Sequence, residues 1–192
     1  MKPTAYPVQV TGTLTKPLSR WLWLVKFILF IPHVVILAVL GFVAAIFVVL
    51  TFFAVLFTGR YPRLLFDFNV GVLRWGWRVS FYELGAFATD AYPPFTMKEG
   101  GYPADLTVEY PERMHRGLVL IKWLLAIPQL WIVGIFSDLI QLLAIIAAIV
   151  VLFTGRYPVE LFEFLMGLNR WSWRVSAYLF LMTDKYPPFS LK

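Results

Sequence analysis

The sequence predicts an all-α integral membrane protein made of two tandem copies of one unit, and its repeats and apolar blocks carry that prediction. Residues 1–96 recur as residues 97–192. The motif Phe-Thr-Gly-Arg-Tyr-Pro at 57–62, for example, returns at 153–158. One register maintained through loops and prolines indicates a tandem duplication. The two copies are therefore expected to share one fold and one function.

The apolar blocks are long enough to place the chain in a membrane. Residues 27–59 contain no charged side chain, and residues 123–155 contain only Asp138. Hydrophobic residues make up 60% of the chain, and its mean hydropathy is +0.74. Runs of this kind are typical of segments that use the bilayer as their solvent.

Each apolar block is predicted to form a transmembrane helical hairpin, over about 21–57 in the first copy and about 116–153 in the second. One straight helix of that length would extend roughly 55 Å, whereas the hydrocarbon core is about 30 Å thick. Gly41 interrupts the first block, and Gly134 precedes a Ser-Asp pair that suits a helix N-cap in the second. We therefore expect each block to fold back at these residues.

The positions of the charges predict the topology. All 17 Lys and Arg residues lie outside the two apolar blocks and flank both ends of each, and the net charge is +6. Basic residues favour the cytoplasmic side of a membrane. Each block is therefore expected to cross twice, which gives four transmembrane helices, parallel copies and both termini in the cytoplasm. The expected location is the cell's inner (plasma) membrane, as a multi-pass protein.

Two prolines and a few polar residues interrupt the apolar blocks. Pro32 and Pro128 are expected to kink their helices, because each removes one intrahelical hydrogen bond. His33 and Gln129 follow them, and we expect these side chains to bond the freed backbone. A role for them in a substrate or proton path is the alternative reading. Asp138 is expected to cap the tip of the second hairpin.

A short strand is predicted at the start of each copy, where residues 8–10 and residues 106–108 alternate apolar and polar side chains. The two strands are expected to pair across a pseudo-twofold axis. Each copy ends in Tyr-Pro-Pro-Phe, an extended segment that we expect to pack back across the base of the hairpin.

The segment after each hairpin, 63–89 in the first copy and 159–183 in the second, is predicted to be an amphipathic helix in the membrane interface. At helical spacing, a narrow polar stripe runs along an otherwise apolar body. Tryptophans beside the stripe suit the depth of the headgroups, and its arginines can hold a phosphate or a carboxylate with two hydrogen bonds. The candidate lipid- or anion-binding residues are Arg74, Arg78, Arg170, Arg174, Trp75, Trp77, Trp171 and Trp173.

A structural role for the same arginines is the other reading. Arg74 or Arg78 would then pair with Asp67, and the equivalent arginines of the second copy would pair with Glu163. A rival topology also follows, in which these helices cross the membrane with paired arginines, each copy has three spans and the copies are inverted. We favour the interfacial placement, because arginines near the bilayer centre cost several kcal/mol.

These motifs resemble a bacterial membrane family known as domain of unknown function 4389. The resemblance rests on Ile-Pro-His at 31–33, on 57–62, on the Arg-Trp-x-x-Arg core at 74–78 and on 90–95, and it covers nearly the whole chain. In the second copy Gln129 replaces the expected histidine. The resemblance implies a membrane protein and brings no activity with it.

Composition excludes several functional classes. The chain has no cysteine, which excludes disulfides and thiolate chemistry, and its two histidines are His33 and His115. Because metal-ligand spacings, phosphate loops and nucleophile elbows are missing, we expect no enzyme, no cofactor and no catalytic or metal site. Membrane topology accounts for the positive charge, so no nucleic-acid partner is expected.

The expected function is that of a non-catalytic membrane scaffold or accessory subunit that engages anionic lipid headgroups or a partner, as a homo-oligomer or within a larger membrane complex. The alternative is an oligomeric transporter or channel subunit. Its pore would need several chains, because four short spans enclose little volume.

Overall fold

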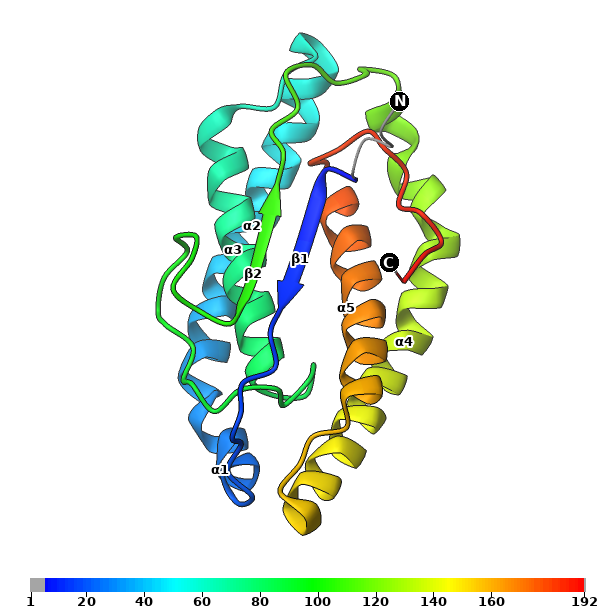
Figure 1. The fold of residues 1–192 in the computed structure, drawn as a ribbon. Coiled ribbons are helices and arrows are strands. Elements are labelled where there is room, and N and C mark those ends of the chain that lie inside the picture. Colours follow the sequence, from blue (N-terminus) through cyan, green and yellow to red (C-terminus); the bar gives the residue numbers. More distant parts are fainter. Residues whose placement is uncertain (1–5, 192) are drawn as a thin grey trace.

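The computed structural model describes residues 6–191, and it gives each copy a strand, a long apolar helix and a shorter helix (Figure 1). This mostly helical fold with a small two-stranded sheet confirms the coarse prediction. The first copy contains β1 (Val8–Gly12), α1 (Leu22–Leu29), α2 (Ile31–Thr58) and α3 (Arg63–Tyr82). The second contains β2 (Ala104–Val108), α4 (Leu118–Thr154) and α5 (Val159–Leu179).

The predicted transmembrane hairpins are wrong, because neither long apolar segment folds back. Helix α2 continues through Gly41, and α4 continues through Gly134 and Ser137. A lone glycine costs a helix only about 1 kcal/mol, which the flanking hydrogen-bonded turns absorb. The Ser137 hydroxyl donates to the Val133 carbonyl at 2.9 Å, one turn back in its own helix, and opens no new helix.

Within residues 6–191 the structure therefore has two candidate membrane spans, where four transmembrane helices were predicted. They cover Leu22–Thr58 and Leu118–Thr154, each 37 residues long, and both are apolar and long enough to cross a membrane. Asp138 lies exposed on the surface of α4 and caps no helix.

The two prolines have different effects. Helix α1 ends at Leu29 and α2 begins at Ile31, so the first long segment is interrupted at Phe30, as the kink prediction at Pro32 requires. The cause is the missing amide hydrogen of Pro32, which leaves the carbonyl four residues earlier without its helical partner. Helix α4, in contrast, continues through Pro128 without interruption.

The shorter helices end before the predicted boundaries, at Tyr82 and at Leu179. Beyond each end the chain turns through a residue with positive φ, Phe87 (51°) in the first copy and Leu181 (63°) in the second. A left-handed residue cannot continue a right-handed helix. The tail that follows therefore leaves the helix and returns along the molecule.

The two strands pair as predicted, and the pairing exchanges them between the copies. β1 and β2 are antiparallel, with Val10 opposite Leu106. In Figure 1 the strands lie side by side between α3 and α5, with α2 beyond α3 and α4 beyond α5. β2 packs against α3, and β1 packs against α5. Each copy thus supplies the strand that covers the other copy's shorter helix.

The two copies run antiparallel to each other. The Met114 amide, just before α4, donates to the Gly59 carbonyl at the end of α2 at 2.9 Å. At the other end of the molecule, Arg20 lies beside Gly155, where α4 ends. The pseudo-twofold axis is therefore perpendicular to the long helices, and the long helices of the two copies run in opposite directions.

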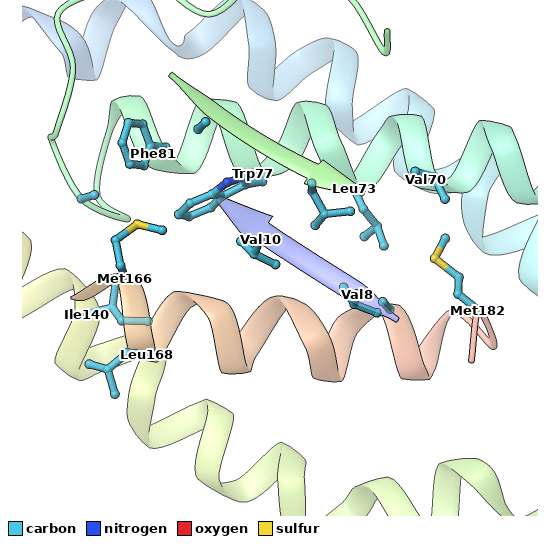
Figure 2. Packing of buried hydrophobic residues seen from close by; sticks show 14 of the residues in the cluster. Val8, Val10, Val70, Leu73, Trp77, Phe81, Ile140, Met166, Leu168 and Met182 are labelled. Atoms are coloured by element: carbon cyan, nitrogen blue, oxygen red, sulfur yellow. The ribbon is translucent and has the colours of Figure 1, made fainter. Parts of the chain in front are cut away.

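One hydrophobic core joins the two copies. Val8 and Val10 of β1 lie between α3, which carries Trp77, and α5, which carries Met166 (Figure 2), and all four side chains belong to one buried cluster. Residues of both copies lose contact with water in the same cluster, and that burial is the main driving force for folding. The repeats at 1–96 and 97–192 are therefore not independent folding units.

Candidate functional site

The inner arginine stripe (Arg74, Arg78, Arg170 and Arg174) is directed at the sheet and not at the outer surface. Arg74 Nε donates to the Leu106 carbonyl of β2 at 2.8 Å and lies 3.0 Å from Asp105 Oδ1, with which it forms an ion pair. Its Nη1 donates to the Met97 carbonyl at 2.8 Å. The guanidinium therefore binds an unpaired strand edge and the tail that runs beside it.

Arg78 continues the same pattern one turn along α3. It is fully buried, and its Nη2 lies 3.3 Å from Asp105 Oδ1 while its Nε donates to the Ala104 carbonyl at 3.3 Å. Burial lowers the pKa of the Arg78 guanidinium, and the Asp105 carboxylate opposes that shift.

The second copy repeats the backbone contacts. Arg170 Nε donates to the Val10 carbonyl of β1 at 3.5 Å, and Arg170 Nη1 donates to the Leu191 carbonyl at 3.0 Å. Arg174 is buried, and its guanidinium carbon lies 5.6 Å from the centre of the Tyr6 ring. In both copies the stripe thus holds the other copy's strand and its own tail.

The predicted ion pairs within the stripe are wrong. Asp67 is exposed and pairs with Arg63 at 3.1 Å, one helical turn before it. Arg74 lies two turns after Asp67, roughly 10 Å along the helix, which is too far for a direct contact. Glu163 is exposed, and it forms no ion pair within residues 6–191.

The tryptophans serve as internal hydrogen-bond donors. Trp75 Nε1 donates to His33 Nδ1 at 3.0 Å, and Trp171 Nε1 donates to Gln129 Oε1 at 2.7 Å. Trp77 Nε1 donates to the Thr11 carbonyl at 2.9 Å. Three of the four tryptophan side chains are buried and Trp173 is half-buried, so the predicted placement among headgroups does not match the structure.

His33 and Gln129 also hold the tails of their copies. The His33 ring stacks on Phe95 with 4.1 Å between ring centres. Gln129 Nε2 donates to the Pro187 carbonyl at 3.0 Å. The expectation that these side chains bond the backbone freed by the prolines is therefore wrong. They join the long helix to the returning Tyr-Pro-Pro-Phe segment, whose packing back onto the helix was predicted.

A pair of buried lysines completes the internal polar network, and the sequence reasoning missed its role. Lys26 Nζ lies 3.1 Å from Asp90 Oδ1, and Lys122 Nζ lies 2.6 Å from Asp184 Oδ1. Both lysines are buried. Their signal in the sequence was the recurrence of lysine and aspartate in both copies, which indicated shared contacts without identifying the partners.

Basic residues remain exposed at both ends of the long helices. The first end cluster (Arg60, Arg113 and Arg116) surrounds a hollow of about 430 Å³ beside Gly59. The second end cluster, at the opposite end of the molecule, consists of Lys16, Arg20 and Arg156 beside Gly155. None of these six cations forms an ion pair within residues 6–191.

The two end clusters are built in the same way. Gly59 and Gly155 each end a long helix with a φ of 69°, a conformation that favours glycine. A β-carbon at Gly59 would lie 3.3 Å from Arg116 Nε, and one at Gly155 would lie 3.0 Å from Arg20 Nε. The glycines therefore let an arginine of the other copy approach the helix end closely.

Comparison with known proteins identifies a family. The model of a domain of unknown function, DUF4389, matches residues 20–97 and again residues 116–190. No curated protein and no solved structure matches the chain. The two matched segments span α1 to the first tail and the start of α4 to the second tail, which are the parts related by the pseudo-twofold axis. The chain therefore belongs to the DUF4389 family and carries its domain twice.

Proposed function

We propose that this protein is a non-catalytic scaffold of the inner membrane, whose long helices lie in the plane of one leaflet and whose end clusters engage anionic lipid headgroups. The observation that carries this proposal is a pair of long apolar helices that stay exposed along their length and have uncovered cations at both ends.

The exposed apolar surface supports membrane embedding. Along α2, Phe42 is 70% exposed and Phe53 is 50% exposed. Along α4, Trp131 is 75% exposed and Ile135 is 66% exposed. Continuous apolar patches of this extent are rare on monomeric soluble proteins and mark membrane or partner surfaces. The regular spread along two helices, on the side away from the sheet, fits a lipid layer.

Helix length and charge position support the in-plane orientation. A helix of 37 residues is about 55 Å long, almost twice the thickness of the hydrocarbon core. Because the copies are antiparallel, spanning helices would place one end cluster on each side of the membrane. Helices in the plane would keep both end clusters on one side, which agrees with the preference of basic residues for the cytoplasmic face.

The opposite face of the molecule supports contact with water. Gln9, Thr11 and Thr13 are exposed on the β1 side, and Glu99 and Glu109 are exposed beside β2. Polar residues on the sheet and apolar residues on the long helices give the molecule two distinct faces. That separation is typical of a protein that lies at a membrane surface.

Headgroup binding is assigned to the end clusters because the inner arginine stripe is already bonded to the sheet and tails. Arg60, Arg113 and Arg116 converge on one hollow, and each planar guanidinium can donate two hydrogen bonds to a phosphate. Three cations without carboxylate partners also attract an anionic surface.

The orientation is tested by labelling single cysteines, because the chain contains none of its own. Lys16→Cys and Glu112→Cys occupy equivalent repeat positions next to the two ends of the molecule, and both sites are exposed. An impermeant maleimide applied to sealed inner-membrane vesicles should label both sites from the same side. Labelling from opposite sides would establish that the long helices span the membrane.

Headgroup binding is tested by flotation of detergent-solubilised protein with anionic or neutral vesicles. Replacing Arg60, Arg113 and Arg116 by Gln should weaken the preference for anionic vesicles on the order of 100-fold, since each basic residue near the surface contributes about 1 kcal/mol. Lys98→Gln with Lys185→Gln is the control, because both lysines are exposed outside the end clusters. If the control variant loses the preference for anionic vesicles equally, the effect comes from net charge and not from the end cluster. Ion flux from liposomes containing the protein would favour the transporter reading.

A further inference from the structure

A second polar site lies between the two long helices, away from the end clusters. A cavity of about 510 Å³ is floored by α3 and α5 and flanked by α2 and α4. Hydroxyl and amide side chains line much of it, among them Ser80, Ser137, Gln141, Ser172 and Ser176. The Ser137, Ser172 and Ser176 hydroxyls each donate to a backbone carbonyl one turn back in their own helix.

Glu83 is the charged residue of this cavity. Its side chain is 7% exposed, and its Oε1 atom is buried without a hydrogen-bond partner within the described residues. Burial raises the pKa of the Glu83 carboxyl, and the Leu84 backbone N–H opposes that shift. An unsatisfied carboxylate oxygen at such a site is costly, and a donor that reached Glu83 from the cavity would offset that cost.

The duplication shows that this carboxylate is not a requirement of the fold. The repeat places Leu179 at the position equivalent to Glu83, also at the end of the shorter helix. The helix of the second copy therefore ends in the same place with an apolar side chain. Glu83 is an addition to the shared architecture, and it makes the cavity acidic on one side.

The rim of the cavity opens to the apolar surface. Val34 on α2 is 45% exposed and Ser137 on α4 is exposed, and both line the cavity. A ligand in this position can therefore have its polar group at Glu83 and an apolar chain along the long helices. Trp173 presents an aromatic ring in the same cavity, which favours a cation further.

We propose that this cavity binds the primary ammonium headgroup of a membrane aminolipid, with Glu83 accepting a hydrogen bond from the ammonium and the acyl chains lying between α2 and α4. The site is separate from the end clusters, so it does not depend on the proposed binding of anionic headgroups. A primary ammonium offers three N–H donors, whereas a quaternary choline headgroup offers none.

The test is competition between two lipids that differ in those donors. Protein in a non-ionic detergent is mixed with equal amounts of ethanolamine and choline phospholipids of identical acyl chains, and bound lipid is counted by native mass spectrometry. The wild-type protein should retain the ethanolamine lipid in about tenfold excess, the factor expected for one charge-assisted hydrogen bond. Glu83→Gln should retain the two lipids about equally.

Two further variants make the result specific. Glu109→Gln removes the same charge from an exposed site outside the cavity, and it should keep the ethanolamine preference. Ser176→Leu leaves Glu83 intact and fills the cavity from α5, and it should lose both lipids. Equal retention of the two lipids by the wild-type protein, or an unchanged preference in Glu83→Gln, would overturn the proposal. Flotation with anionic vesicles should be unaffected by Glu83→Gln.

Discussion

The first and second copies hold the strands by the same backbone contacts but with different charges. Arg74 and Arg170 each donate to a strand carbonyl and to a tail carbonyl. The carboxylate of Asp105, from β2 of the second copy, lies beside Arg74 of the first copy, whereas the repeat puts Gln9 at the equivalent position of β1. The common element is therefore the bonding of arginine to an open strand edge, and the ion pair is a local addition.

The same comparison explains why arginine recurs in the stripe. A buried strand edge presents carbonyl oxygens that must be hydrogen-bonded, and the two-stranded sheet leaves its outer edges without a neighbouring strand. A guanidinium carries five donors in one plane, so one side chain satisfies a strand and a tail together. Lysine would supply the charge without this planar fork.

The largest expected difference between the copies concerns Asp105. Asp105→Gln gives β2 of the second copy the residue that β1 of the first copy carries, and it leaves Arg74 and Arg78 without their carboxylate. The free energy of unfolding should fall by roughly 3–5 kcal/mol, as for other broken buried ion pairs. Gln9→Ala, at the exposed equivalent position, should change it by less than about 0.5 kcal/mol. Denaturant unfolding in detergent measures both, and equal effects would show that the ion pair adds no stability.

The two buried lysine–aspartate ion pairs, one in each copy, should contribute equally to stability. Lys26→Met and Lys122→Met each leave a half-buried aspartate without its cation, and each should cost about 2 kcal/mol. The measurement is thermal unfolding, with Asp90→Asn and Asp184→Asn completing a double-mutant cycle for each pair. If the double-mutant cycle shows a lysine–aspartate coupling energy in one copy and none in the other, the two tails are held by different interactions.

Glu83 should give the first copy a pH dependence that Leu179 cannot give the second. Burial raises the pKa of the Glu83 carboxyl above its usual 4.5, so its neutral form favours folding, and that stability is lost as the pH rises through the raised pKa. Glu83→Gln should therefore gain roughly 1–2 kcal/mol over the wild type near pH 8 and little near pH 4. Unfolding curves of both proteins in lipid-free detergent across this pH range measure the difference in stability. A wild type that gains stability relative to Glu83→Gln as the pH rises would contradict the prediction.

The smallest expected effect concerns His33. His33→Gln gives the first copy the acceptor of the second, and the amide oxygen should take the Trp75 N–H as Gln129 takes that of Trp171. The cost should stay below about 1 kcal/mol, since one hydrogen bond replaces another. The reciprocal change Gln129→His is the matched measurement by thermal unfolding. A loss of several kcal/mol in either direction would show that the two sites are not interchangeable.

Several features followed from the sequence alone, because they depend on local pattern. The register of the duplication is set by residue identity, and it predicted the two strands and the shorter helices after each Thr-Gly-Arg-Tyr-Pro turn. The absence of charge over 27–59 predicted an apolar helical segment that belongs in a membrane, although this segment was expected to fold back at Gly41. Period-2 alternation and glycine-terminated helices are properties of short windows, so they are readable without the fold.

The tertiary structure decided how these elements combine. Helical spacing placed Asp67 and the arginines on one stripe, but it could not show that a strand of the other copy would cover that stripe. The unbroken course of α2 through Gly41 is a local outcome, because one glycine costs less than the helical hydrogen bonds around it supply. The antiparallel copies, the buried tryptophans and the Glu83 cavity all arise from contacts between segments distant in sequence. Such contacts leave no periodicity in either segment alone, and so the sequence offered the arginines lipid phosphates or carboxylates of their own helix as partners, where the structure points them at the sheet.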